Sequence, residues 1–228
     1  MEDCAAPSGV KSAQGSNVFG VGASMAKVLP LFFVSLACIA LPAMAQPPAP
    51  LSPTQAPPAL AVVARARQEV ERAVSYDGRW VPIRYPGGDV PAGSGVCTDV
   101  VIRGYRAAGL DLQQLVHEDV VRAPSAYAGW VKRPDANIDH RRVGPLGVYL
   151  QRHAARLPVD DAKSYAPGDV VIISFAACPA CSPQHVGVVS DRKGPRGLPL
   201  MIHNLGPTPT EDDTLDAWPR LAHYRLLP

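Results

Sequence analysis

Three side chains of this sequence, Cys97, His185 and His203, could together perform nucleophilic catalysis. A thiol attacks a carbonyl group once a neighbouring imidazole has taken its proton, and that imidazole needs a polar partner to fix its orientation and tautomer. In this arrangement Cys97 is the nucleophile, His185 is the base and His203 orients the base. The alternative is that Cys97 is a small buried residue of the core and that both histidines are structural.

The segment around Cys97 predicts the start of a helix. A Gly-rich loop at 85–94 leads into a pattern with the spacing of one helix face, and Gly109, which readily adopts a left-handed conformation, ends it. The partial positive charge at a helix N-terminus favours a thiolate over a thiol, so we expect Cys97 to have a lowered pKa. The residues that share this helix face are Cys97, Val100, Val101, Gly104, Tyr105 and Ala108.

The two histidines fall on neighbouring predicted strands. Segments 185–191 and 200–204 are rich in apolar and β-branched residues, and a tight turn at 194–197 joins them. Because the strands of a hairpin lie side by side, His185 and His203 can meet on one face of the predicted sheet.

The pattern of the remaining segments predicts an α+β fold. Helical periodicity comes first and apolar strands joined by turns follow, an order typical of helices packed on an antiparallel sheet. Beyond the helix that starts at Cys97, we expect helices at 59–75, 112–120 and 146–157, and strands at 80–85, 170–175, 185–191, 200–204 and 221–226.

A polar segment at 137–142 is a candidate substrate clamp. Arginine side chains bind carboxylates through two parallel hydrogen bonds, and this segment carries two adjacent arginines. The alternative is a solvated loop whose ion pairs contribute little. With one carboxylate near the helix start and one amide beside His203, the candidate substrate-binding residues are Asp99, Asp139, His140, Arg141, Arg142 and Asn204.

Cys178 and Cys181 form a C-x-x-C pair shortly before His185. With His185 and His203, the two thiolates could hold a tetrahedral zinc ion. However, only one half of such a site has the familiar spacing, and an exported protein would more readily oxidise the pair to a disulfide. We therefore expect a loop disulfide or two free thiols, with no metal and no cofactor, and we keep zinc binding as the alternative.

The N-terminal part of the chain predicts export. Residues 25–45 combine a short positive start, an apolar stretch and a small-x-small cleavage site, as a secretory signal does. The apolar stretch is too short to span a membrane. We expect 1–24 to be a non-native or unstructured extension, 46–58 to be a Pro-rich linker, and 59–228 to be the folded domain of a periplasmic or secreted protein.

The composition narrows the range of partners. The chain has 228 residues, of which 47% are hydrophobic, and its formal net charge is +2. A protein that binds nucleic acid would be more basic, with its positive charges clustered. We expect no nucleic-acid partner, no membrane span in the mature form, and a monomer.

Several blocks of this sequence, in the same order, resemble the bacterial exported family DUF1287, a domain of unknown function. The resemblance covers about residues 60–228, which is essentially the whole predicted domain. The blocks lie at 76–81 (YDGRWV), 85–91 (YPGGDVP), 95–103 (GVCTDVVIR), 137–143 (NIDHRRV), 167–171 (PGDVV), 185–191 (HVGVVSD) and 202–206 (IHNLG).

That family is similar, more distantly, to the papain-like NlpC-type peptidoglycan peptidases. The similarity rests on a cysteine at a helix start, on Pro-Gly-Asp before a buried strand, and on one histidine in each of two successive strands. In those enzymes the matching positions are nucleophile, base and orienting residue, which implies these roles for Cys97, His185 and His203. NlpC-type enzymes usually have Asp-Cys-Ser-Gly where this chain has Val-Cys-Thr-Asp at 96–99.

The resemblance implies a papain-like fold and hydrolysis of amide bonds in cell-wall peptides through a thioester intermediate. We therefore expect an exported cysteine amidase or peptidase that acts on peptidoglycan peptides. A second hypothesis is a non-catalytic module of the same fold that binds the cell envelope. A third is a zinc-binding protein that uses Cys178, Cys181, His185 and His203. The presence of the cysteine together with both histidines favours catalysis.

Overall fold

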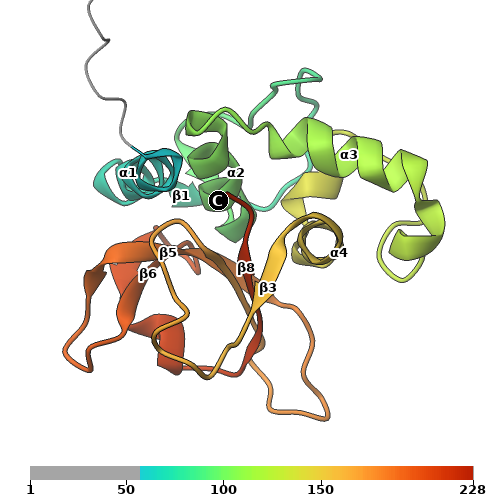
Figure 1. Cartoon of the computed structure of the whole chain (residues 1–228). Coiled ribbons are helices and arrows are strands. Elements are labelled where there is room, and N and C mark those ends of the chain that lie inside the picture. Colours follow the sequence, from blue (N-terminus) through green and yellow to red (C-terminus); the bar gives the residue numbers. More distant parts are fainter. Residues whose placement is uncertain (1–56, 228) are drawn as a thin grey trace, which may run out of the picture. The chain divides into compact units, whose positions relative to one another are not determined.

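The computed structural model describes residues 57–227. These residues form a sheet and a set of helices that lie over one of its faces (Figure 1). The predicted extension, the signal segment and most of the predicted linker lie outside these residues. Four α-helices precede the main sheet strands, as an α+β fold requires, so the predicted class is confirmed. None of the described helices is long and apolar enough to cross a membrane. The helices are α1 (Pro58–Glu71), α2 (Cys97–Ala107), α3 (Leu112–Arg122) and α4 (Val143–His153).

One six-stranded antiparallel sheet forms the C-terminal part of the domain. Its strand order is β3-β8-β4-β5-β6-β7, and a separate short parallel pair, β1-β2, lies beside the start of α2. The strands are β1 (Ser75–Tyr76), β2 (Ser94–Gly95), β3 (Ala155–Leu157), β4 (Val170–Ile173), β5 (His185–Lys193), β6 (Pro199–His203), β7 (Thr210–Asp212) and β8 (Arg220–Arg225).

Alternation along the strands divides the apolar side chains between the two faces of the sheet. One face packs against the helices and forms the main core, whereas a smaller cluster covers the other face. The strand residues of the main core include Val170, Ile172, Val186, Val188 and Ile202, and the smaller cluster consists of Val171, Ile173, Val189, Met201 and Leu215.

The element boundaries differ from the sequence expectations in several places. The predicted strand at 80–85 is wrong, because this segment has no regular structure and the Ile83 backbone N–H donates to the Asn137 side chain instead of to a neighbouring strand. The helix expected at 146–157 begins earlier, at Val143, and its last predicted turn is strand β3. The short strands β1, β2 and β7 were not expected, since two or three residues are too few to show a periodic pattern.

Helices α1 and α2 lie side by side over the sheet, and both contact β5 and β6 (Figure 1). Gly104 lets α1 approach closely, since a Cβ atom at this position would lie 3.0 Å from Val62 Cγ1. On the sheet side the Tyr105 hydroxyl donates to the Gly168 carbonyl over 2.8 Å. At the start of the helix the Asp99 carboxylate accepts from the Val96 N–H over 2.7 Å and satisfies one of the free N–H groups there. These contacts fix the position of residue 97.

The Gly-rich loop before α2 is held by the buried guanidinium of Arg103. It forms an ion pair with Glu69 of α1, bonds Asp89 over 2.8 Å and donates to the Ser94 carbonyl over 3.0 Å. Gly88 is required within this loop, because a Cβ atom there would lie 1.8 Å from a backbone oxygen. The loop therefore delivers the chain to Cys97 in a defined conformation.

Candidate active site

Cys97 is the first residue of α2 and is 7% exposed. Burial raises the pKa of its thiol to about 11, although the backbone N–H groups of Val186 and Thr98 act in the opposite direction. The expected lowering of this pKa is therefore wrong, because removal of the thiolate from water outweighs the helix N-terminus. The resting side chain is a neutral thiol.

His185 and His203 are brought together as the hairpin predicts. His185 Nε2 lies 2.9 Å from His203 Nδ1, and both side chains are 2% exposed. Burial, together with the neighbouring His203, lowers the pKa of His185 to about 3. His185 is therefore a neutral imidazole at physiological pH.

The Asp212 carboxylate, which the sequence did not indicate, extends the two histidines into a hydrogen-bonded row of three side chains, His185, His203 and Asp212. His203 Nε2 lies 3.2 Å from Asp212 Oδ1 and 3.2 Å from the Thr214 hydroxyl. Burial opposes the charge of Asp212, but hydrogen bonds from Thr214, Thr210 and His203 outweigh it and lower the pKa of this carboxyl. Asp212 lies in the three-residue strand β7, whose only signal was a cluster of acidic and threonine residues at 210–214.

These contacts indicate where the hydrogens of the two imidazoles lie when each ring carries a single one. A carboxylate can only accept, and Thr214 donates its own hydrogen to Asp212, so His203 must carry its hydrogen on Nε2. Its Nδ1 then accepts a hydrogen from His185 Nε2. His185 Nδ1 is left without a hydrogen, which is the state that a general base requires.

Helix α2, which begins at Cys97, packs against β5, which begins at His185. The backbone N–H of Val186, the residue that follows His185, acts to lower the pKa of the Cys97 thiol. Within residues 57–227, no hydrogen bond joins the Cys97 sulfur to either imidazole. The roles of nucleophile, base and orienting residue therefore stay predictions.

Phe175 covers the imidazole of His185. The two rings stack with centroids 5.8 Å apart and an interplanar angle of 30°. Phe175 is itself 42% exposed, so its ring separates the imidazole from solvent on one side. This contact contributes to the burial that keeps His185 neutral.

Asp99 and Arg141 bind each other. The Arg141 guanidinium donates two hydrogen bonds of 2.9 Å to the Asp99 carboxylate, and the side chains are 2% and 3% exposed. Arg141 also donates to the backbone carbonyls of Asp77 and Arg79, both over 3.2 Å. The pair ties the start of α2 to the β1 region, which favours a positioning role for both residues.

Three other candidate substrate-binding residues are buried, and two of them bond other parts of the protein. Asp139 accepts from the Asp135 N–H over 2.9 Å and lies 2.8 Å from His117 Nδ1. His140 is 2% exposed, and burial lowers its pKa to about 4. Asn204 is fully buried and donates to the Gly95 carbonyl over 3.2 Å. This last contact fixes β6 against the loop that precedes Cys97.

A pocket of about 380 Å³ opens beside Cys97, and we call it the cysteine pocket. Arg142 lines it and is exposed, and within the described residues its side chain forms no ion pair or hydrogen bond. Partial burial raises the pKa of the Tyr76 phenol, Cys97 raises it further and Arg142 opposes the rise, so all three groups face the same space. Two further residues of the lining are Trp130 and Gln184.

The family model of DUF1287, a domain of unknown function, matches residues 63–226 of this chain. The chain belongs to the DUF1287 family. It is 44% identical over 169 residues to a protein of Escherichia coli strain K12 named "Uncharacterized protein YijF", and the match covers 73% of this chain and 80% of that protein.

Two solved structures are similar to this DUF1287 protein, NlpC2 and NlpC1 of Trichomonas vaginalis. The TM-scores are 0.46 and 0.45, with 14% and 12% sequence identity. Each match covers 76% of this chain, but only 49% of NlpC2 and 46% of NlpC1. The DUF1287 chain therefore spans about half the length of these two proteins.

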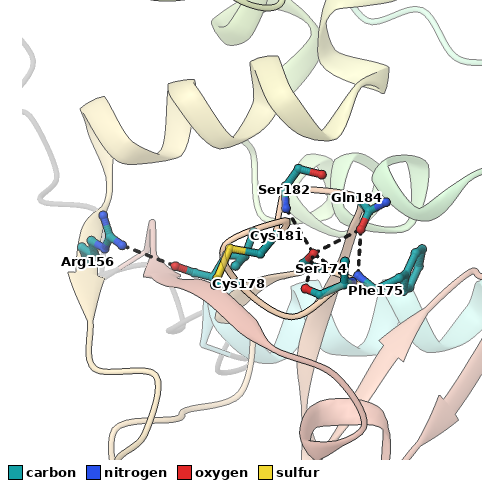
Figure 2. The surroundings of a disulfide bond; sticks show 9 residues. Arg156, Ser174, Phe175, Cys178, Cys181, Ser182 and Gln184 are labelled. Carbon is teal, nitrogen blue, oxygen red and sulfur yellow. Dashed lines mark hydrogen bonds between the residues drawn. A yellow bond between two sulfur atoms is a disulfide. The ribbon is translucent and has the colours of Figure 1, made fainter.

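The C-x-x-C pair of this DUF1287 protein is a disulfide (Figure 2). Cys178 and Cys181 are joined, with their Cα atoms 4.5 Å apart, in the loop between β4 and β5. The zinc alternative is therefore wrong, because both of its sulfur ligands are used by the disulfide. Within residues 57–227 no group of three histidine, cysteine or acidic side chains could hold a metal ion.

The disulfide loop forms one wall of the cysteine pocket. The Ser174 hydroxyl lies at its centre: it donates to the Ala176 carbonyl over 2.9 Å and accepts from the Ser182 N–H over 3.1 Å (Figure 2). The Gln184 side-chain oxygen accepts a hydrogen bond of 2.8 Å from the Phe175 N–H, and Gln184 also lines the pocket. The loop thus connects the residue that covers His185 to the opening beside Cys97.

Proposed function

We propose that this DUF1287 protein is an exported cysteine amidase or peptidase that hydrolyses amide bonds in peptidoglycan peptides. The observation that carries the proposal is the row His185–His203–Asp212, whose hydrogen bonds leave His185 Nδ1 free to accept a proton. A row of this kind can serve as the base for a nucleophilic thiol, and Cys97 begins α2, the helix that packs against the strand that carries His185.

The reaction we propose begins with the neutral Cys97 thiol and the neutral His185 imidazole. His185 Nδ1 takes the proton of Cys97 as the sulfur attacks the substrate carbonyl carbon and forms a C–S bond. Backbone N–H groups near Cys97 stabilise the negative charge that develops on the carbonyl oxygen. His185 then gives the proton to the departing amine as the C–N bond breaks. Water, activated by the same imidazole, hydrolyses the thioester and restores the thiol.

The raised pKa of Cys97 and the lowered pKa of His185 support a concerted proton transfer. A thiolate and an imidazolium would both be costly in this buried site, so charge develops only when the substrate carbonyl is there to receive it. The row that ends at Asp212 stabilises the imidazolium that forms.

Arg142 supports an anionic substrate. Two arginines, Arg141 and Arg142, line the cysteine pocket. Arg141 is paired with Asp99, whereas the side chain of Arg142 has no partner among the described residues. A carboxylate of a cell-wall peptide could bind this guanidinium through two parallel hydrogen bonds. Of the arginines expected in the substrate clamp, we assign substrate contact to Arg142.

Export to an oxidising compartment belongs to the same proposal. The disulfide between Cys178 and Cys181 supports it, because such bonds persist mainly outside the reducing cytoplasm. The predicted signal at 25–45 and cleavage after residue 45 are part of this proposal.

The test is digestion of purified muropeptides by the protein beside its Cys97→Ala variant, with the products identified by mass spectrometry. We expect a new fragment that appears with the unchanged protein and not with the variant, and its mass identifies the bond that is cut. Cleavage by both proteins alike would overturn the assignment of Cys97 as nucleophile.

A second function, a non-catalytic module that binds envelope peptides, is favoured by one observation. Within the described residues the Cys97 sulfur has no hydrogen bond to an imidazole, whereas the two imidazoles bond each other. On this hypothesis neither protein cleaves muropeptides, but both retain them in a pull-down, and retention falls when Arg142 is replaced.

A further inference from the structure

Three consecutive carboxylates, Glu211, Asp212 and Asp213, lie where the hydrogen-bonded row ends. Among these three described side chains, Asp212 is the one that bonds His203, over 3.2 Å. Successive side chains of a strand point to opposite faces, so a shift of β7 by one residue would turn a different carboxylate toward the row. The residue types at 211–213 therefore do not select Asp212, and another contact must fix the register of β7.

The backbone of β7 specifies its register only weakly. The strand has three residues and lies at the edge of the sheet, where it pairs on one side only, with β6. Its sequence, Thr-Glu-Asp, is polar on both faces. A strand with an apolar face is held in register by burial of that face, and β7 has no such face.

Arg67 of α1 binds the middle residue of β7. Its guanidinium donates to both oxygens of the Glu211 carboxylate, over 2.8 and 2.7 Å, and the two side chains are 16% and 7% exposed. Because Glu211 is held toward α1, Asp212 faces the opposite side of the strand. His203 lies on that same side, since its strand partner is Thr210, two residues before Asp212.

Arg67 is itself fixed by β5, the strand on which the row begins. Its guanidinium donates to the Ser190 hydroxyl over 3.2 Å and forms an ion pair with Asp191. Arg67 thus connects α1 to the strands at the two ends of the row. Arg192 also bonds Glu211, over 3.1 Å, but its side chain is 61% exposed, so solvent weakens this second contact.

We propose that Arg67 is a positioning residue that sets the register of β7 through Glu211. In this register Asp212, and not a neighbouring carboxylate, bonds His203. Among the described residues Arg67 does not line the cysteine pocket and bonds no side chain of the row, so it acts through β7. The catalytic use of the row rests on the proposed function, but its register can be measured without a substrate.

The first measurement is the tautomer of His203. Protein labelled with ¹⁵N-histidine is studied by NMR near neutral pH, and the signals of His203 are assigned by their absence from a His203→Asn variant. In the unchanged protein we expect hydrogen on Nε2, because the Asp212 carboxylate accepts from it. In Arg67→Gln we expect a mixture of the Nε2–H and Nδ1–H forms, because β7 no longer keeps Asp212 opposite the ring.

The second measurement is the rate of muropeptide cleavage. Arg67→Gln should lower kcat about 10-fold with little change in KM, since Arg67 acts on the row and not on the substrate. Arg67→Lys keeps the charge but cannot donate two parallel hydrogen bonds, so it should recover only part of the rate and of the Nε2–H signal.

A double replacement separates register from charge. Arg67→Met together with Glu211→Leu removes the ion pair but leaves an apolar side chain at 211, which burial still directs toward α1. We expect this protein to recover both the Nε2–H signal and the rate.

The matched control is Arg196→Gln. Arg196 pairs with Asp213, the carboxylate on the other side of Asp212, but is 52% exposed. Solvent screens this pair, so we expect neither the His203 spectrum nor kcat to change. Should Arg67→Gln not fold, Arg67→Lys takes its place, with the same mixture of tautomers expected to a smaller extent.

The outcomes separate the positioning role from the proposed function. If the His203 tautomer is the same with and without Arg67, if Arg196→Gln changes it equally, or if the double replacement does not restore it, the role of Arg67 is wrong and the proposed function stands. If the tautomer responds as expected but even the unchanged protein cleaves no muropeptide, Arg67 sets the register and the proposed function is wrong.

Discussion

At the scale of single residues, the chemistry of this protein depends on two neutral groups that burial keeps neutral. A thiol at a helix N-terminus would ordinarily ionise more easily, yet removal from water raises the pKa of Cys97 to about 11. The same effect lowers the pKa of His185 to about 3. On the proposed function, each group exchanges a proton with the other during the reaction rather than before it.

Alkylation of Cys97 should therefore increase steeply only in alkaline solution. Because the thiolate is the reactive form, we expect the rate with iodoacetamide to rise with pH toward a midpoint well above the ordinary cysteine pKa of about 8.5. Mass spectrometry of the 97-containing peptide at a series of pH values gives this profile. A plateau already reached at pH 7 would contradict a buried thiol and would restore the thiolate expected from the helix start.

Replacement of Arg142 by glutamine should weaken binding of an anionic substrate. Loss of a charge-assisted pair of hydrogen bonds predicts a KM about 10-fold higher with little change in kcat. The matched control is Arg133→Gln, an exposed arginine that does not line the cysteine pocket. Equal effects of the two replacements would mean that Arg142 acts only through the general charge of the protein.

At the scale of secondary-structure elements, the row that we propose as catalytic crosses three adjacent strands. His185 lies on β5, His203 on β6 and Asp212 on β7, and the antiparallel register brings them into hydrogen-bonding contact. The backbone ladder therefore sets the order of the donors and acceptors.

The Asp212→Asn variant tests this order. An amide can donate as well as accept, so it no longer requires a hydrogen on His203 Nε2, and we expect kcat to fall about 10- to 100-fold with little change in KM. Asp213→Asn is the control, because this neighbouring carboxylate pairs with Arg196 and not with His203. A kcat unaffected by Asp212→Asn would remove the carboxylate from the row.

The buried pair of Asp99 and Arg141 links α2 to the segment before α4. Breaking a buried ion pair leaves one charge uncompensated, so Asp99→Asn should lower the free energy of unfolding by about 3 to 5 kcal/mol. Asp77→Asn, which removes a partner of the exposed Arg79, should have a much smaller effect, because solvent screens that pair. Urea unfolding of both variants measures the difference, and equal losses would contradict the structural role of the buried pair.

At the scale of the whole domain, burial of His185 makes stability depend on pH. The unfolded chain binds a proton near pH 6.5, whereas the folded protein does so only near pH 3. The stabilisation is thus complete above pH 6.5 and is lost as the pH falls from 6.5 to 3, at a cost of the order of 4 kcal/mol. His140, with its pKa lowered to about 4, contributes in the same direction.

Unfolding measured at several pH values should show this loss directly. His185→Asn cannot take up the proton, so its stability should fall less steeply between pH 6.5 and 3 than that of the unchanged protein. His140→Asn should remove a separate share of the slope. If the slope is the same with and without His185, the imidazole is already accessible to water in the folded state.

The positions of the main candidates could be predicted because they lie in elements with strong patterns. The helix face that starts at Cys97 and the apolar strands that carry His185 and His203 show their period directly in the sequence. Asp212 could not be predicted, since β7 has only three residues and shows no period. The roles of the residues in the clamp expected at 137–142 could not be predicted for a similar reason. Arg141 lies in a loop, 42 positions from Asp99, and the local sequence gives no sign of that pairing.

The α+β class, the helix that begins at Cys97 and the hairpin that joins the two histidines could be predicted from the sequence, because these depend on local periodicity and short turns. The raised pKa of Cys97, the lowered pKa of His185, the partner of Arg141, the disulfide between Cys178 and Cys181 and the pocket beside Cys97 appear only in the folded chain. Each of these depends on which groups exclude water from one another across long sequence separations. Burial and long-range contact are properties of the packed chain, so local pattern cannot specify them.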